Sequence, residues 1–206
     1  MKQILVIFVT LLLFVFSFQC SEKNKPTGPD LEDPNYYYPV NLDYKWTYVH
    51  LNIGCVEGDS FVITAIGRNE RPEGPGWDLV SSSGDTSFRY QLGDSIFYEN
   101  NVTYPPSSPS YKVLIRPVKA GTFWKDAFDF EYSIVGFEDL YSSIAGMTYQ
   151  GCAKIRRTQS GNPTVKYLWW APQFGRVKEV EYAFGDTLNC LQGEELKRLD
   201  KSPINP

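Results

Sequence analysis

Short segments rich in aromatic and β-branched residues follow one another along most of the chain. The first two cover residues 44–53 (YKWTYVHLNI) and 60–66 (SFVITAI), and their composition fits a pleated, half-buried surface. Nine more follow at residues 77–83, 86–92, 95–100, 111–117, 128–137, 147–157, 164–172, 176–184 and 187–196. Residues 138–145 are compatible with one helical turn or more, and residues 194–200 are ambiguous, but neither segment is long enough to shape the fold. The pattern therefore predicts an all-β protein with little helix.

The connections between these segments have the composition of hairpin turns. Gly-Asp followed by Ser or Thr occurs at residues 58–60, 84–86, 93–95 and 185–187. Glycine adopts the positive φ of a tight turn, and aspartate accepts hydrogen bonds from nearby backbone amides. Calcium binding is the weaker alternative, because the spacing of these aspartates forms no regular ligand loop.

Two longer breaks, at residues 71–76 (RPEGPG) and 100–110 (NNVTYPPSSPS), contain several prolines. Proline cannot donate to a strand ladder, so both breaks are expected to be exposed loops. Such loops either contact a partner or are ordinary surface.

Successive hairpins predict a single antiparallel meander of ten or eleven strands that curls into a barrel or half-open barrel. Pairing the first strand antiparallel to the last would protect two sheet edges. This register places Lys45 near Asp200 and brings Cys55 opposite Cys190. A disulfide between these two cysteines is therefore predicted.

Cys152 is left over if Cys55 pairs with Cys190. By strand alternation Cys152 shares a face with Lys154, so it is expected to lie outside the deep core. No zinc or other metal site is predicted, because the chain has no CxxC pair and its only histidine, His50, lies apart from these cysteines.

The aromatic content is high, and the adjacent residues Trp169 and Trp170 are its most informative part. Neighbouring strand residues face opposite sides of a sheet, so at most one of the two enters a single core. The other is expected to line a lumen or groove, to be exposed, or to be covered by a loop or helix. Together with Trp124, these tryptophans are the candidates for contact with an apolar or aromatic-stacking ligand.

Catalytic patterns are weak. His50 lies inside the first predicted strand and no GxSxG elbow occurs, which indicates a structural histidine. Asp126, Asp129 and Glu131 lie beside aromatic residues, as paired acids do in glycosidases. However, these acids alternate with aromatic residues in the way of a strand with one solvated face. No catalytic residue is therefore predicted, and a hydrolase is the least favoured function.

The charge balance argues against nucleic-acid binding. The formal net charge is −4 and no basic block occurs, whereas nucleic-acid phosphates require clustered Lys and Arg. The short run Lys154, Arg156 and Arg157 is interpreted as an exposed strand end. Phosphate-binding glycine loops are absent from the sequence, and no cofactor is predicted.

The N-terminus has the pattern of an export signal. After a single lysine, residues 4–18 are uncharged and apolar, but these 15 residues fall short of the roughly 20 needed to span a bilayer. The lone Cys20 and the polar segment that follows it resemble the tether of a bacterial lipoprotein, which implies lipid attachment at Cys20. Gln19 stands where such sites usually have Gly, Ala or Ser, so a secreted form and an uncleaved anchor remain alternatives. The predicted parts are a signal peptide, a lipidated cysteine with its tether, a β-domain and a tail, at residues 1–19, 20–34, 35–200 and 201–206.

Motifs near both ends of the predicted domain resemble a broad set of uncharacterised exported bacterial lipoproteins. The first motif is an early Tyr-Tyr-Pro followed by a Trp-x-Tyr strand, at Tyr37, Tyr38, Pro39, Trp46 and Tyr48. The second is a late Trp-Ala-Pro-x-x-Gly-x-Val-Lys, at Trp170, Ala171, Pro172, Gly175, Val177 and Lys178. The third is the segment GCAKIRR, residues 151–157. The resemblance implies a cell-envelope location, anchored on the periplasmic or outer face of a membrane, and brings no catalytic residues. A looser similarity is to half-barrel carriers of lipid and lipoprotein.

Two functions remain open at this point. The first is non-catalytic binding of an apolar or aromatic-stacking ligand by a membrane-anchored β-domain. The alternative is a structural envelope protein that binds another protein through exposed aromatics and Pro-rich loops.

Overall fold

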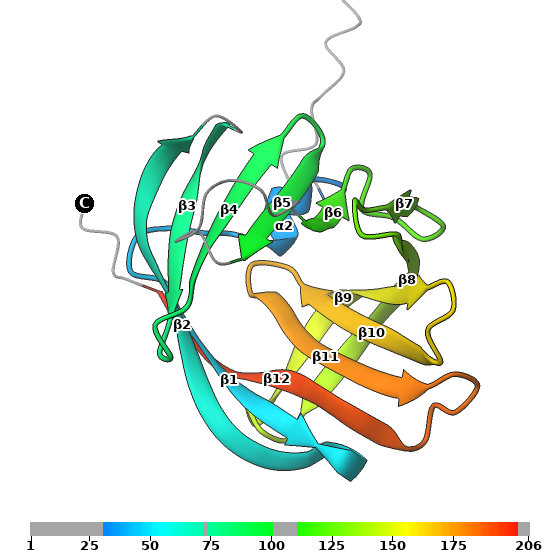
Figure 1. Ribbon diagram of the computed structural model, residues 1–206. Coiled ribbons are helices and arrows are strands. Elements are labelled where there is room, and N and C mark those ends of the chain that lie inside the picture. The colour runs from blue at the N-terminus through cyan, green and yellow to red at the C-terminus, as the bar shows by residue number, and fades with distance from the viewer. Residues whose placement is uncertain (1–30, 72–73, 101–110, 202–206) are drawn as a thin grey trace, which may run out of the picture. The chain divides into compact units, whose positions relative to one another are not determined.

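A computed structural model describes residues 31–71, 74–100 and 111–201 of the chain. Twelve antiparallel strands form one sheet that curls into a nearly closed barrel, which confirms the predicted fold class (Figure 1). The elements are α2 (Pro34–Tyr37), β1 (Lys45–Asn52), the 3₁₀ turn η1 (Ile53–Cys55), β2 (Val56–Arg71), β3 (Gly74–Ser81), β4 (Thr86–Leu92), β5 (Ser95–Asn100), β6 (Tyr111–Ile115), β7 (Phe123–Lys125), β8 (Phe130–Ser142), β9 (Met147–Gln159), β10 (Thr164–Ala171), β11 (Gly175–Ala183) and β12 (Cys190–Asp200).

The first and last strands pair in the predicted register. β1 runs antiparallel to β12 with Lys45 opposite Asp200. This ladder joins strands β1–β6 to strands β7–β12. The edges of the sheet are therefore β6 and β7, which are neighbours in the sequence, and not the two chain ends.

Side chains span the gap between β6 and β7. The indole N–H of Trp124 on β7 donates to the carbonyl of Lys112 on β6 at 2.8 Å, and the rings of Tyr111 and Phe128 stack with centroids 4.4 Å apart. These contacts bring the two sheet edges together without a backbone ladder, which is why the barrel is nearly but not fully closed.

Several local predictions were wrong. Residues 58–60 lie inside β2, and the turn between β1 and β2 is formed by η1. β8 extends to Ser142 where a helical turn was considered, and Gly74–Gly76 belong to β3, not to a loop. The three-residue β7 was not predicted, because three residues are too few to show alternation. Most of the loop predicted at 100–110 and all of residues 1–20 lie outside the described residues.

A short N-terminal segment is tied to β4. Asp33 caps α2 by accepting a hydrogen bond from the amide of Asn35 at 2.8 Å. The buried guanidinium of Arg89 on β4 donates to the Asn35 side chain at 2.8 Å and to the Tyr38 carbonyl at 3.0 Å. Tyr38 is thereby held where its ring packs on Trp170, with centroids 5.0 Å apart.

The cysteines lie in two environments. Cys55 and Cys190 form a disulfide that joins η1 to the start of β12. Cys152 is a free thiol and is fully buried, so its predicted place outside the deep core was wrong. It packs in the same core cluster as Tyr149 and Trp169, because this side of β9 is covered as well. Burial raises the pKa of the Cys152 thiol to about 12, which makes it a poor nucleophile.

In the part of the chain that the structure describes, no helix has the length and apolar character needed to cross a bilayer.

The disulfide is expected to contribute strongly to stability, since it closes a loop of 135 residues. Replacing Cys55 and Cys190 by Ala should lower the free energy of unfolding by about 2–5 kcal/mol, measured by urea denaturation. Dithiothreitol should lower the stability of the wild-type protein to a similar extent and leave the double variant unchanged. Equal stability of the reduced and oxidised wild-type protein would contradict this pairing.

Candidate functional site

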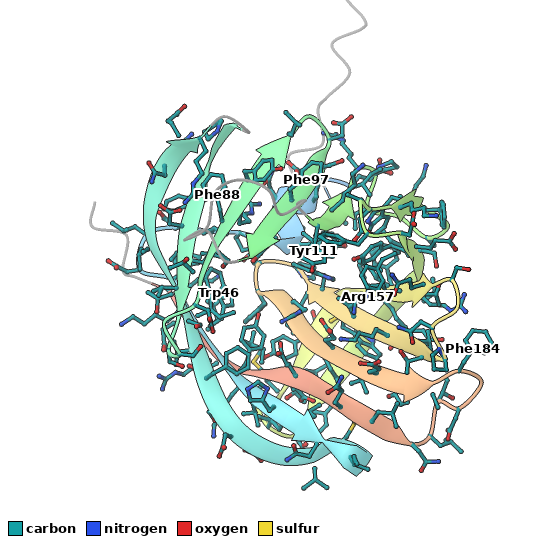
Figure 2. All side chains as sticks on the ribbon, in the orientation of Figure 1. Trp46, Phe88, Phe97, Tyr111, Arg157 and Phe184 are labelled. Atoms are coloured by element: carbon teal, nitrogen blue, oxygen red, sulfur yellow. A yellow bond between two sulfur atoms is a disulfide. The ribbon has the colours of Figure 1, made fainter. Side chains whose placement is uncertain are left out.

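A cavity of about 460 Å³ lies in the interior of the barrel. Its size falls within the range of small-molecule sites in proteins. Strands from both halves of the sheet contribute to its wall, which consists of Tyr38, Tyr48, Phe61, Ile63, Ser81, Tyr111, Val113, Phe130, Tyr132, Ile155, Arg157, Leu168, Trp170, Arg176, Glu179 and Glu194. Seven of these side chains are aromatic and four are charged, so the wall combines stacking surfaces with ionic groups. Figure 2 labels Tyr111 and Arg157 within this interior region.

A β-bulge brings two charged residues of β11 to the same wall. Arg176 and Glu179 are separated by three positions, so simple alternation would place them on opposite faces. The pairing of β10 with β11 shifts so that Trp169 faces Lys178 while Trp170 faces Arg176, which leaves one extra residue on β11. Both Arg176 and Glu179 therefore line the cavity.

Gly193 allows β12 to approach β11 closely next to these groups. A Cβ atom at Gly193 would lie 2.2 Å from the carbonyl oxygen of Glu179, far inside any real contact distance. The missing side chain thus lets the adjacent Glu194 lie within reach of Arg176.

Three charged side chains of the wall, Arg176, Glu179 and Glu194, form a continuous network with Lys166 and Glu181 across β10, β11 and β12. Arg176 lies 2.6 Å from Glu179 and 2.5 Å from Glu194, and Lys166 lies 2.8 Å from the other oxygen of Glu179. Lys166 also lies 3.5 Å from Glu181. Each acid of the network therefore has a cationic partner, as buried charges require.

These cations determine the protonation state of Glu179. Burial alone would raise the pKa of this carboxyl, but Arg176, Lys166 and Arg157 lower its pKa to about 2. Glu179 is therefore ionised at neutral pH and is unsuited to act as a general acid.

Aromatic rings of the wall pack against the guanidinium groups of Arg176 and Arg157. The Arg176 guanidinium lies 5.6 Å from the ring centroid of Tyr48, whose hydroxyl donates to the Arg176 carbonyl at 2.9 Å. The Arg157 guanidinium lies 4.7 Å from the ring centroid of Phe130. Both distances fit cation–π contacts.

The two adjacent tryptophans face opposite sides of β10, as alternation requires. Trp170 lines the cavity, and its indole N–H has no hydrogen-bond partner among the described residues. Trp169 lines a separate surface hollow of about 560 Å³, where its indole N–H donates to Glu138 at 2.6 Å. Trp124 does not line the cavity but stacks on Tyr132, which does, with ring centroids 5.1 Å apart. Only one of the three predicted tryptophans therefore reaches the interior site.

The acids considered for glycosidase chemistry have structural roles or are exposed. Asp126 accepts hydrogen bonds from the backbone amides of Phe128 and Phe130 and from the Tyr132 hydroxyl, at 2.9, 3.1 and 3.0 Å. Asp129 pairs with Lys125 on the surface. The two acids therefore do not form a pair across a cavity.

His50 lies beside Glu194 of the ion network and is not part of a catalytic group among the described residues. Its ring stacks on Phe61 with centroids 4.5 Å apart, and its Nδ1 atom lies 4.0 Å from Glu194. Within residues 31–71, 74–100 and 111–201, no group of three or more His, Cys, Asp or Glu side chains is arranged to hold a metal ion.

Sequence reasoning missed the charged part of the site. Arg157 was interpreted as part of an exposed strand end, and that was wrong, because this side chain lines the cavity. Arg176 and Glu179 were not singled out, since the strand RVKEVEY has the ordinary alternation of a half-solvated strand and the bulge in β11 leaves no trace in that alternation.

Comparisons with known proteins add little to this description. No protein-family model matches the chain, and no curated protein matches it. Among solved structures, the chain is similar to a presumed lipoprotein from Parabacteroides distasonis ATCC 8503, with 17% identity, a TM-score of 0.43 and coverage of 80% of this chain and 98% of that one. It is also similar to a presumed exported protein with a YmcC-like fold from Bacteroides fragilis NCTC 9343, with 13% identity, a TM-score of 0.42 and coverage of 79% and 98%. Similarity at this level carries no argument about the function of this chain.

The ion network makes a testable contribution to stability. The pKa of Glu179 is lower in the folded state than its ordinary value of 4.5, so its stabilisation is complete above about pH 4.5 and is lost as the pH falls towards 2. Glu179→Gln should lower the free energy of unfolding at pH 7 by on the order of 3 kcal/mol. The difference from wild type should shrink between pH 4.5 and pH 2, measured by urea denaturation across that range.

Glu131→Gln, which changes an exposed carboxylate on β8, is the matched control and should follow the wild-type pH dependence. A constant difference between Glu179→Gln and wild type from pH 7 to pH 2 would show that the effect is not ionic.

Proposed function

We propose that this chain is an exported, lipid-anchored envelope protein whose β-domain binds a small ring-bearing ligand without catalysis. The aromatic-walled cavity is the observation that carries the proposal. Trp170, Tyr48 and Tyr132 are among the seven aromatic side chains of its wall, and a wall rich in aromatic rings favours a ligand with planar or ring-shaped parts.

The two carboxylates of the cavity wall, Glu179 and Glu194, are both paired with Arg176, and this arrangement favours binding over acid–base catalysis. A glycosidase needs one carboxyl that holds a proton near neutral pH, but cations keep the pKa of the cavity residue Glu179 at about 2. The pKa of the buried Cys152 thiol, raised by burial, makes it equally unsuitable as a nucleophile.

Two observations support export and anchoring. The Cys55–Cys190 disulfide fits an oxidising compartment, where such bonds persist. The apolar residues 4–18 and the lone Cys20, which lie outside the described residues, have the pattern of a lipoprotein signal and its lipid-attachment site.

A second candidate function is contact with another envelope protein. Three apolar side chains on β8 are exposed, with Val135 at 48%, Phe137 at 44% and Tyr141 at 67% of their full exposure. Phe137 lies between two surface hollows of about 700 and 560 Å³. Such a group of exposed apolar residues is typical of an interaction surface.

Binding in the cavity can be tested with N-phenyl-1-naphthylamine, a neutral ring compound whose fluorescence rises in apolar surroundings. We expect saturable binding to the purified full chain with a stoichiometry near one. Val113→Trp inserts a large side chain into the cavity wall and should weaken this binding at least about tenfold, because the added volume competes with the probe.

Val135→Trp is the matched control, since it makes the same substitution on the exposed face of β8. Its probe affinity should equal that of wild type. Absence of saturable binding would sink the proposal, and if only Val135→Trp impairs the protein in cells, the partner-binding function is favoured instead.

Anchoring can be tested by metabolic labelling with an alkyne-bearing fatty acid. Wild-type protein should carry the label and sediment with membranes, whereas Cys20→Ser should lose the label, because the thiol is the attachment point. Cys152→Ser, which changes a buried thiol of the β-domain, should keep the label. Equal labelling of wild type and Cys20→Ser would refute lipid attachment at this residue.

A further inference from the structure

Arg157 differs from the other charged residues of the cavity wall in its partners. Arg176 is bound by both acids of the wall, and Glu179 has Lys166 as a second cation. Glu179 and Glu194 each have a cationic partner within 4.0 Å. Across the described residues, no carboxylate oxygen lies within that distance of the Arg157 guanidinium. A cation that lines a cavity without a paired carboxylate is suited to an anionic ligand group.

The contacts of Arg157 leave its donors accessible. The guanidinium packs over the Phe130 ring, a contact made through the flat face of the group. The positive charge of Arg157 also acts against the effect of burial on the pKa of the neighbouring Tyr132 hydroxyl. A guanidinium carries five N–H donors in its plane, so donors remain for a planar oxyanion.

The ion pairs of Glu179 and Glu194 argue against a cationic ligand. Glu179 lies within ion-pair distance of two cations, and Glu194 accepts from Arg176 at 2.5 Å. A ligand cation would have to displace one of these internal partners, whereas a ligand anion can approach Arg157 directly. Phe130 and Tyr132 lie near Arg157, and their aromatic rings provide surfaces for the rest of the ligand.

We propose that the ligand carries an oxyanion, a carboxylate or a phosphate, attached to its ring system, and that Arg157 binds this group. This inference rests on the function proposed above and specifies the chemical class of the ligand. The oxyanion accepts hydrogen bonds from Arg157 while the ring stacks on the aromatic wall.

Two probes with the same ring system test the inference. N-phenyl-1-naphthylamine is neutral, and 1-anilinonaphthalene-8-sulfonate adds an oxyanion to the same skeleton. The wild-type full chain should bind the anionic probe at least about tenfold more tightly than the neutral one. Arg157→Gln should weaken binding of the anionic probe by about tenfold to a hundredfold and leave the affinity for the neutral probe unchanged within about twofold.

Arg156→Gln is the matched control, because it removes the same charge from the neighbouring position of β9, which does not line the cavity. It should keep the preference for the anionic probe. Competition identifies the ligand group: 1-naphthylacetate competing better than 1-naphthyl phosphate indicates a carboxylate, and the reverse order indicates a phosphate. The neutral 1-naphthylacetamide should compete more weakly than both.

The outcomes separate this inference from the proposed function. If neither fluorescent probe binds saturably, the proposed function fails. If the neutral probe binds and the anionic probe binds no more tightly, or if Arg157→Gln weakens both probes equally, only the oxyanion inference is overturned. Should Arg157→Gln fold poorly, the comparison of 1-naphthylacetate with its amide on the wild-type protein decides the question.

Discussion

The pairing of β1 with β12 is the interaction on which the rest of the structure depends. Among residues 31–71, 74–100 and 111–201, it is the only ladder that joins strands β1–β6 to strands β7–β12, because the sheet is open between β6 and β7. The cavity wall draws residues from both sets, so no cavity forms without this ladder. Pairing strands that lie so far apart in the sequence costs loop-closure entropy, and the disulfide between Cys55 and Cys190 offsets that cost at one end of the ladder.

A second constraint follows from placing charges inside the barrel. Removing Glu179 and Arg176 from water costs several kcal/mol for each ion, so the pair provides little net stability relative to apolar side chains in the same places, although removing one partner leaves the other charge uncompensated. The bulge opposite Trp170 and the absent side chain of Gly193 both bring these ions into contact. Apolar residues would fill the same wall at a lower cost in folding free energy. The presence of an ionic network therefore favours a role for these charges in selecting the ligand that enters the cavity.

The sequence allowed the architecture to be predicted more fully than the site. Aromatic and β-branched alternation identified eleven of the strand regions, and closing the meander predicted the register of Lys45 with Asp200. Prediction failed where a residue's environment depends on other strands. Cys152 is buried because both sides of β9 are covered. Glu179 faces the cavity together with Arg176 because of the bulge in β11, which the alternation of polar and apolar residues does not reveal. Arg157 faces the cavity together with Ile155, as alternation along β9 requires, but its charge was taken as the sign of an exposed position. Trp170 was correctly taken as one member of an oppositely facing pair, but only tertiary contacts distinguish the cavity side from the Glu138 side.

The mixed character of the wall also distinguishes this cavity from one built for hydrocarbon alone. An acyl chain accepts no hydrogen bonds, so filling the cavity with it would strip water from Arg157 without replacing those contacts. The wall near Arg157 is flat and aromatic, whereas a bare chain gains nothing from stacking geometry or from a guanidinium fork. A ligand with a ring and an anionic group satisfies both halves of the wall at once. The likeness to half-barrel lipid carriers is one of fold alone, and a lipid that filled this cavity would need an anionic headgroup to match the charged part of the wall.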